Sequence, residues 1–222
     1  AKRSPTSQHI PQSGITAIYV PEHFRQSDQA VQLDLIRDYP FGLLVSGTGE
    51  DMTATHMPFV LDSDAGTPAL LGHMARANDQ WRAFDGSTTV MAVFQGAHAY
   101  VSPNWYATPG RVPTWNYSAV HVYGMAEVID DPDQVAGVLS QMVTTFENPS
   151  TGDWSMDNLK PESLSAMMRG IVVFRIPIAR IDGKQKLSQD KTPEDVQGVI
   201  TGLREQKGEN AEATADQMGD DL

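Results

Sequence analysis

The sequence predicts an α+β barrel of about six strands, with helices inserted between the strands. Short apolar or alternating segments recur between turn residues, which is the pattern of strands. Helical spacing is confined to a few separate segments, so helices and strands do not alternate as they would in a βαβ sheet. The 222 residues suffice for one large domain or two small ones.

The first elements are a helix and three strands. Ser27 is expected to cap a helix that runs to residue 38 and ends before Pro40. Three apolar residues of this helix are expected to share its buried face: Val31, Leu35 and Ile36. Strands are then expected at 41–48, 52–61 and 69–75, where apolar, Thr and Val residues are frequent.

The second half continues with strands and four helices. Asn78 is expected to cap a short helix, and a buried strand follows at 88–94. A long strand at 115–129 alternates, with Trp115, Tyr117, His121 and Tyr123 on one face and Asn116, Ser118, Val120 and Val122 on the other. Helices are expected at 133–147 and 161–168, and a single strand at 171–181. Thr192 opens the last helix with the capping box Thr-Pro-Glu-Asp.

The aromatic segment 94–123 is the most informative part of the sequence for function. It holds seven of the seventeen aromatic residues and three prolines, and Arg111 is its one charged side chain. Each Trp or Tyr brings a polar group that needs a partner when it is buried, and Pro cannot donate to a strand ladder. Two interpretations stay open, a lining for a flat, partly polar ligand and an aromatic barrel core with one tight loop.

Composition and charge exclude several classes of function. The chain has no Cys, which excludes disulfides, thiolate nucleophiles and Cys-ligated metals. It has no run of 18 apolar residues and no apolar leader segment, so we expect a cytoplasmic protein without a membrane span. The net charge of −12, with no basic cluster, makes direct binding to duplex DNA doubtful.

The ends of the chain differ in composition from the body. Residues 1–17 are polar and lack periodicity, so they are interpreted as a disordered arm or an expression remnant. Residues 208–222 are acidic and are expected to form a disordered, solvated tail. The folded domain is therefore expected to span 18–207.

Ordered motifs along this body resemble the PaiB-type FMN-binding negative transcriptional regulators. They are YVPEHF at 19–24, HMPF at 56–59, LLGHMARANDQW at 70–81, VFQGAHAYVSPNWY at 93–106, VPTWNY at 112–117, AVHVYG at 119–124 and KLSQD at 186–190. The chain departs from the family pattern at two places, where Asp79 and Ala97 each replace a Pro. Neither change removes a polar ligand group, although Asp79 adds a negative charge.

The resemblance implies an FMN-binding split β-barrel, mostly antiparallel, of about six to eight strands with peripheral helices. It also implies a homodimer with flavin sites at the subunit interface, acting on a small-molecule substrate that the sequence does not name. FMN would carry hydride or electron transfer, and any effect on transcription would be indirect. The alternative is a haem-binding or cofactor-free module in which His73, His98 or His121 serves as a haem ligand.

Two polar clusters suit the FMN phosphate. Arg76 and the Asn78 cap follow the strand at 69–75, in the family context of a phosphate site, and His73 lies beside them. The other interpretation is a surface Arg beside an ordinary helix cap. Lys186, with Ser188 and Gln189, follows the expected last strand, where a solvated turn is the alternative.

Aromatic and amide groups of the segment 94–123 are candidates for the flavin ring. Ser102, Trp105 and Tyr106 belong to an expected loop, and Trp105, Tyr106 and Trp115 can cover a ring face. Thr114 and Asn116 can bond the polar edge of the flavin, although core packing explains any one of these residues equally well. No His pair has the spacing of a metal site, and no motif supports a nucleophile, a P-loop or a dinucleotide fold.

Overall fold

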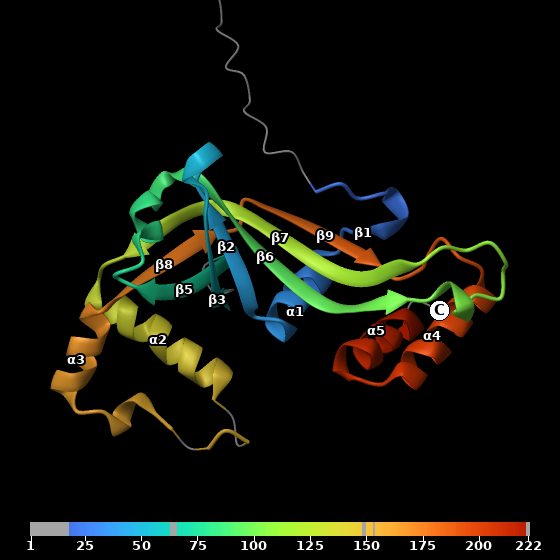
Figure 1. The fold of residues 1–222 in the computed structure, drawn as a ribbon. Coiled ribbons are helices and arrows are strands. Elements are labelled where there is room, and N and C mark those ends of the chain that lie inside the picture. The colour runs from blue at the N-terminus through green and yellow to red at the C-terminus, as the bar shows by residue number, and fades with distance from the viewer. Residues whose placement is uncertain (1–17, 63–65, 148–149, 153, 221–222) are drawn as a thin grey trace, which may run out of the picture.

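The computed structural model describes residues 18–62, 66–147, 150–152 and 154–220, and the expected N-terminal arm lies outside these ranges. The described residues form nine strands in one antiparallel, strongly curled sheet (Figure 1), ordered β3-β2-β6-β7-β8-β5-β4, with β9 paired to β7 and β1. The strands are β1 (Arg25–Gln26), β2 (Phe41–Ser46), β3 (Thr53–Pro58), β4 (Val60–Asp62), β5 (Ala69–Ala75), β6 (Asp85–Val101), β7 (Thr114–Ile129), β8 (Ile171–Pro177) and β9 (Arg180–Lys186). The helices are α1 (Gln29–Asp38), α2 (Pro132–Phe146), α3 (Pro161–Arg169), α4 (Pro193–Gln206) and α5 (Glu209–Asp220), with short 3-10 turns between elements.

The long hairpin of β6 and β7 forms the centre of the sheet. The expected alternation of β7 is confirmed, because Asn116, Ser118, Val120 and Val122 are buried and face inward. Val120 and Val122 belong to a core that includes three fully buried phenylalanines, Phe59, Phe94 and Phe174. Asn116 and Ser118 instead face α5, where they bond to Met218 and Gln217. β6 runs further than the predicted strand at 88–94 and continues to Val101, with a register shift between Gln95 and His98.

The first helix forms as expected but begins one residue later. Asp28, and not Ser27, is the cap, because its carboxylate accepts a hydrogen bond of 2.8 Å from the Ala30 amide. Leu35 and Ile36 are buried as predicted, whereas Val31 is exposed and Leu33 takes its place in the core. The buried face is therefore rotated relative to the sequence prediction.

Two segments predicted as single strands are each split in two. The segment 52–61 forms β3 and β4, and the segment 171–181 forms β8 and β9. The strands are interrupted at Phe59 and at Ile178–Ala179. β8 pairs with β5 and with the C-terminal end of β7, while β9 pairs with the N-terminal half of β7. As a result Lys184 and Lys186 lie within a strand and not after one.

The predicted acidic tail is wrong, because residues 209–220 form α5. This helix packs on α4 and β6 and buries Ala211, Thr214, Ala215 and Met218. These residues recur at helical spacing, while the acidic residues occupy the opposite face. The apolar face of α5 completes a second core cluster with Leu203 of α4 and Val101 of β6.

The outer face of the sheet around β2, β6 and β7 is left open. Four large apolar side chains on this side are exposed: Phe41 (65%), Tyr100 (40%), Trp115 (53%) and Met125 (44%). By contrast α2 covers β4, β5 and β8 through a third apolar cluster, which includes Val138, Met142 and Val173. Within the described residues no helix is long and apolar enough to cross a membrane.

Candidate functional site

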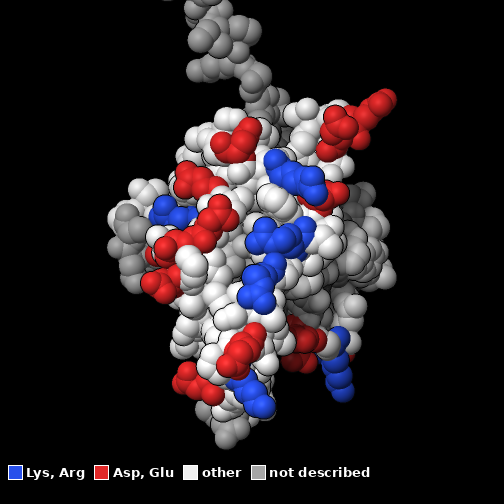
Figure 2. Space-filling model, turned by 90° about the vertical axis from the view of Figure 1, so that its left-hand side faces the viewer, with Lys and Arg blue, Asp and Glu red and all other residues white. Residues whose placement is uncertain are grey.

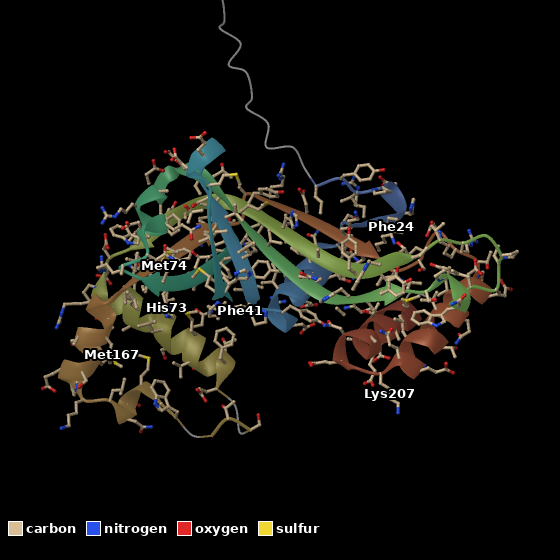
Figure 3. The ribbon with its side chains drawn as sticks, viewed as in Figure 1. Phe24, Phe41, His73, Met74, Met167 and Lys207 are labelled. Atoms are coloured by element: carbon tan, nitrogen blue, oxygen red, sulfur yellow. The ribbon has the colours of Figure 1, made fainter. Side chains whose placement is uncertain are left out.

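The predicted ligand-binding residues fall into two clusters at opposite ends of β7. Arg76 and Asn78 follow β5, which pairs with β8 beside the C-terminal end of β7. Thr114 and Lys186 lie at the N-terminal end of β7, where it pairs with β9. β7 has 16 residues, and a strand of this length spans about 50 Å. Figure 3 shows the same separation, with His73 on the left and Phe24, beside the end of β9, on the right.

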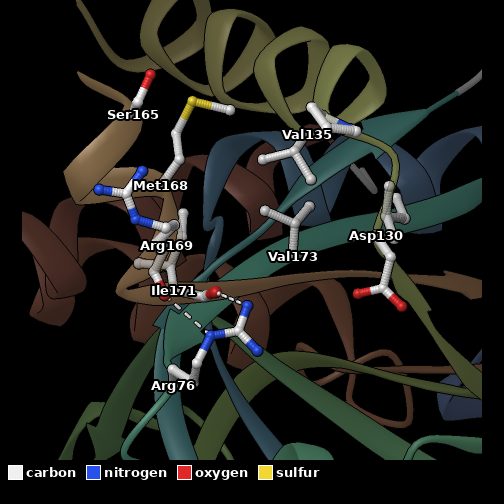
Figure 4. Close-up of a pocket in the computed structure, with 10 residues that line it drawn as sticks. Arg76, Asp130, Val135, Ser165, Met168, Arg169, Ile171 and Val173 are labelled. Atoms are coloured by element: carbon white, nitrogen blue, oxygen red, sulfur yellow. Dashed lines mark hydrogen bonds between the residues drawn. The ribbon is translucent and has the colours of Figure 1, made fainter. Parts of the chain in front are cut away.

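Arg76 is held in one orientation by backbone carbonyls. Its Nε donates to the Arg169 carbonyl (2.9 Å) and its Nη2 donates to the Ile171 carbonyl (2.8 Å). These bonds use two of its five N–H donors, and the guanidinium borders a cavity of about 300 Å³ that Asp130 and Ser165 also line (Figure 4). We call this cavity the β5 pocket. An oriented guanidinium beside an open cavity suits a phosphate.

The surroundings of the β5 pocket mix both signs of charge. Arg76 and Arg82 both lie over the indole of Trp81, 5.8 and 5.7 Å from its centroid. Figure 2 shows a small basic group at the centre of this end of the molecule, with acidic residues around it. Asp79, the departure from the family pattern, pairs with Arg82 at 2.9 Å. Its negative charge is thus partly compensated by Arg82.

Asn78 has a structural role. As predicted, it caps the following helix, because its Oδ1 accepts from the Gln80 amide (3.1 Å). Its Nδ2 donates to Thr55 Oγ1 at 3.0 Å and so ties the end of β5 to β3. The capped element is a five-residue 3-10 turn, Asp79–Ala83, and too short to provide the anion site expected at a helix start.

His73 does not line the β5 pocket. It points towards α2, and its Nδ1 lies 3.3 Å from the thioether sulfur of Met142. Burial lowers the pKa of His73 below its ordinary value, so the ring is neutral at pH 7. The expectation that His73 helps to hold a phosphate is therefore not supported by its position.

The second cluster surrounds a cavity of about 300 Å³ at the end of β9, which we call the β9 pocket. Its polar and charged lining residues are Tyr106, Arg111, Thr114, Lys186, Ser188, Asp190 and Lys191. Lys186 Nζ donates to Thr114 Oγ1 (2.6 Å) and to the Trp115 carbonyl (2.7 Å), both uncharged groups. Burial lowers the pKa of Lys186, while Asp190 acts in the opposite direction.

Arg111 belongs to the β9 pocket, although the site prediction did not include it. Its Nη2 and Nε donate to the buried carboxylate of Asp195, at 2.7 and 3.1 Å. The signal in the sequence was its position as the one charged side chain of the segment 94–123. Asp195, in the first turn of α4, was assigned only to a helix cap.

Tyr106 presents a buried hydroxyl to the β9 pocket. Burial raises the pKa of this phenol. The hydroxyl lies near Ser188, but no hydrogen bond of acceptable geometry reaches it from the described residues. A buried polar atom without such a bond is expected to have a ligand or water as its partner. With Lys186 and Arg111 nearby, the pocket suits an anionic or hydrogen-bond-accepting group.

Three other predicted residues stabilise the turn below this pocket. Asn116 is fully buried and its Nδ2 donates to Ser188 Oγ at 2.9 Å. Ser188 adopts a positive φ of 71°, which is uncommon outside glycine. Gln189 donates to the Gln185 carbonyl and accepts from the Leu187 amide. The core-packing interpretation fits Asn116 better than contact with a flavin edge.

The loop aromatics have different environments. Ser102 caps the 3-10 turn Pro103–Trp105 by accepting from the Asn104 amide. Trp105 packs against α4, so close that a Cβ on Gly202 would lie 2.3 Å from its ring. Trp115 is on the open face, 6.2 Å from both His98 and Tyr100, and stacks on the imidazole. Of the three predicted ring contacts, Trp115 is the exposed one.

These features fit a flavin nucleotide in their chemistry. The open face offers exposed aromatic and apolar surface for a planar ring, and each pocket offers cationic donors. Within the described residues, no group of three His, Cys, Asp or Glu side chains could hold a metal ion.

Comparison with known proteins agrees with this arrangement. The family model described as "Putative FMN-binding domain" matches residues 18–180. The chain is 34% identical to "Protease synthase and sporulation protein PAI 2" of Bacillus subtilis, over 92% of this chain and 98% of that protein. It is also 31% identical to an uncharacterized protein of Aspergillus fumigatus, over 76% of this chain and 84% of that one.

Solved structures show the same fold at low sequence identity. The flavocytochrome Anf3 from Azotobacter vinelandii aligns with a TM-score of 0.58 and 18% identity, over 73% of this chain and 69% of that one. The FAD and heme binding protein from Mycobacterium smegmatis aligns with a TM-score of 0.57 and 16% identity, over 78% of each chain. The predicted split β-barrel with peripheral helices is thereby confirmed.

Proposed function

The chain belongs to the family of FMN-binding domains that includes the PaiB protein of Bacillus subtilis, and from this premise we propose that two copies build each FMN site together. FMN is the cofactor of this family. In the proposal the protein is a cytoplasmic homodimer and an oxidoreductase acting on a small molecule. Any effect on transcription follows from that chemistry or from a protein partner.

The main support for the proposal is the separation between the β5 pocket and the β9 pocket. Both the β5 pocket and the β9 pocket suit a polar ligand, yet they lie at opposite ends of a strand of about 50 Å. FMN is much shorter than this strand and does not reach both within one protomer. A second copy, related by a twofold axis, can bring its β9 pocket to the β5 pocket of the first.

The open face of the sheet supports a partner copy. Exposed Phe41, Trp115 and Met125 give this face the apolar character typical of a homodimer interface. Lys184 and Lys186 lie on the same face, opposite Ala119 and Tyr117 in the β7–β9 register. The dimer would bury the apolar residues and keep the cations beside the ligand.

Each of these side chains has a specific role in the proposed dimer. Arg76 of one protomer holds the phosphate, oriented by the carbonyls of Arg169 and Ile171. Lys186 and Tyr106 of the other protomer donate to the polar edge of the ring, and Trp115 covers part of its face. When bound, FMN supplies hydride or electron transfer. The protein binds and orients the flavin, and the apolar face excludes water from it.

A ligand comparison tests the phosphate assignment. A charge-assisted hydrogen bond is worth about 1.5–3 kcal/mol, so Arg76→Ala should weaken FMN about ten- to a hundredfold. Riboflavin, which lacks the phosphate, should bind the variant almost as it binds the native chain. Titrations followed by flavin fluorescence measure both affinities.

Arg82→Ala is the matched control for this titration. Arg82 lies over the same indole as Arg76 but does not line the β5 pocket. Asp79 is changed to Asn in the same variant, so that removal of Arg82 leaves no unpaired charge near the pocket. FMN affinity should then stay within about twofold, as for surface substitutions generally. If Arg76→Ala loses affinity for FMN and for riboflavin equally, Arg76 does not bind the phosphate.

Haem is the second candidate ligand. The relevant observation is His98, which is partly exposed on the open face and stacked on Trp115. The Mycobacterium smegmatis protein, which shares the fold, binds both FAD and heme. The visible spectrum of freshly purified protein separates the candidates, because a haem protein shows an intense Soret band and a flavoprotein shows the two broader flavin bands.

A further inference from the structure

A third cavity lies between α2 and α3, against β5 and β8, and its volume is about 270 Å³. Figure 3 labels His73 and Met167, which line it from β5 and from α3. The full lining is His73, Leu139, Met142, Val143, Trp154, Met156, Leu159, Leu164, Met167, Met168 and Ile171. It contains no carboxylate, so a hard cation has no ligand here.

Methionine is concentrated in this cavity. Four of the ten methionines of the chain are among its eleven lining residues. Methionine often fills irregular gaps in a core, but these side chains leave the space between them open. Met167 is 61% exposed and Met156 and Met168 are partly exposed, so three of the four are accessible from solvent.

His73 and Met142 hold two donor atoms close together at the wall of the cavity. The imidazole Nδ1 and the thioether sulfur are 3.3 Å apart. With metal–nitrogen and metal–sulfur bonds of about 2.0–2.3 Å, as zinc makes them, two atoms at this distance can bind one ion.

We propose that His73, Met142 and methionines of α3 and its preceding loop form a binding site for a single Cu(I) ion. Thioether ligands are soft and select Cu(I), and imidazole suits copper as well. The apolar lining favours a singly charged ion over a divalent one, because desolvation of charge is costly. Folding brings these ligands together from four separate segments, which is why sequence spacing does not reveal them.

Competition for Cu(I) tests the site. The full-length protein is titrated without oxygen against Cu(I) held by bathocuproine disulfonate, whose colour reports the copper that it retains. One equivalent should move to the protein. Changes in the surroundings of a metal ligand typically cost ten- to a hundredfold in affinity, so His73→Leu and Met142→Leu should each lower the affinity at least about tenfold.

A control variant, Met125→Leu, and a competing ion, Zn(II), distinguish this site from general binding of copper. Met125→Leu removes an exposed methionine of the open face and should leave the affinity unchanged. Met142→Leu nearly conserves side-chain volume, so it should fold like the native chain. Zn(II) should not compete, since the cavity offers neither thiolate nor carboxylate.

A direct measurement covers the case of a variant that fails to fold. Ag(I), a soft ion that air does not oxidise, is added to the native protein with methyl-labelled methionine. The NMR signals of Met142 and Met168 should shift while that of Met125 stays. Failure to compete for Cu(I), unchanged affinity in Met142→Leu, or silver shifts outside the cavity would each overturn the proposal.

We expect copper affinity not to depend on bound FMN. Met168 lines both this cavity and the β5 pocket, so the titration is done with and without added FMN. His73→Leu should lose copper and keep FMN affinity, because His73 does not line the β5 pocket. Loss of both ligands together would instead point to general disruption of this end of the protein and count against the copper site.

Discussion

Asp195 shows how tertiary structure gives a residue a task that its sequence motif does not predict. The capping box is half formed, because Thr192 accepts from the Asp195 amide. The Asp195 carboxylate, however, accepts from the Thr108 amide at 2.8 Å and from Arg111 at 2.7 Å. It therefore ties the loop before β7 to α4 and orients Arg111 at the β9 pocket.

The pKa of Asp195 leads to a prediction about acid stability. Burial alone would raise this pKa, but the bonds from Thr108 and Arg111 outweigh burial and hold it below its ordinary value. A carboxyl with a lowered pKa stabilises the fold above its ordinary pKa of about 3.9 and loses that contribution as the pH falls further. Asp195→Asn should therefore lower Tm at pH 7.

The dependence on pH separates this effect from simple damage to packing. The difference in Tm between the native chain and Asp195→Asn should narrow as the pH falls below about 4. Thermal unfolding followed by circular dichroism between pH 7 and pH 3 measures it. A difference in Tm that stays constant over this range would show that the charge of Asp195 does not matter.

The sequence predicts which kinds of residue form the site better than it predicts which neighbours each of them contacts. Arg76, Lys186 and Tyr106 were selected as polar or aromatic groups of the right kind, and each lines a cavity. Asn116 and Trp105 are of the same kinds, but Asn116 bonds to Ser188 and Trp105 packs against α4. Whether a polar group faces a ligand or a neighbour depends on contacts between segments far apart in sequence.

At the scale of elements, α4 meets the loop after β6 through a close contact at glycine. A Cβ on Gly202 would lie 2.3 Å from the Trp105 ring, whereas nothing lies within 4 Å of a Cβ on Gly137 in α2. Gly202→Ala should destabilise the fold by about 1–3 kcal/mol, because it overpacks a filled contact. Gly137→Ala should stabilise it by about 0.5–1 kcal/mol, the ordinary gain for Ala in a helix.

Urea unfolding of the two glycine variants measures this difference. Both substitutions add the same methyl group to a helix, so any difference in sign comes from the surroundings. A stabilising effect of Gly202→Ala would contradict the contact between Trp105 and α4.

Elements with strong periodicity were predictable, and those decided by pairing were not. β5 was predicted with its observed bounds, α2 was placed within one residue at each end, and the start of α4 at the Thr192 cap was predicted. The split of 171–181 into β8 and β9 depends on which strand each half pairs with, and this is a property of the whole sheet. α5 was missed because its acidic surface obscured four small or apolar residues at helical spacing.

At the scale of the molecule, charge argues against direct contact with DNA. A net charge of −12 gives little counterion release on a duplex. The full chain should therefore show no submicromolar binding to random-sequence duplex at about 50 mM salt, where electrostatic binding is strong. Fluorescence anisotropy measures this, with the chain's own upstream region as a second probe. Tight binding with a steep salt dependence would restore a direct role on DNA.

The DNA measurement needs the complete chain. A shorter protein ending at Lys207 would carry fewer acidic residues, but it would also lack α5 and expose the cluster around Leu203 and Val101. The β5 pocket supports the charge argument as well, because Asp130 lines it beside Arg76 and Arg169.

Molecular mass gives a first test of the two-copy site. The chain has a mass of 24.3 kDa, and light scattering at micromolar concentration should report about twice this value for a C2 dimer. A stable monomer that binds FMN would contradict a shared site.

Complementation between two defective variants tests the shared site most directly. Arg76→Ala and Lys186→Ala should each weaken FMN binding alone. After the two proteins are unfolded, mixed in equal amounts and refolded, half of the dimers carry one chain of each kind. Each mixed dimer has one site with both residues intact and one site with neither, so about a quarter of all sites should regain native affinity. If no sites regain native affinity although mixed dimers form, Arg76 and Lys186 do not meet across a subunit interface.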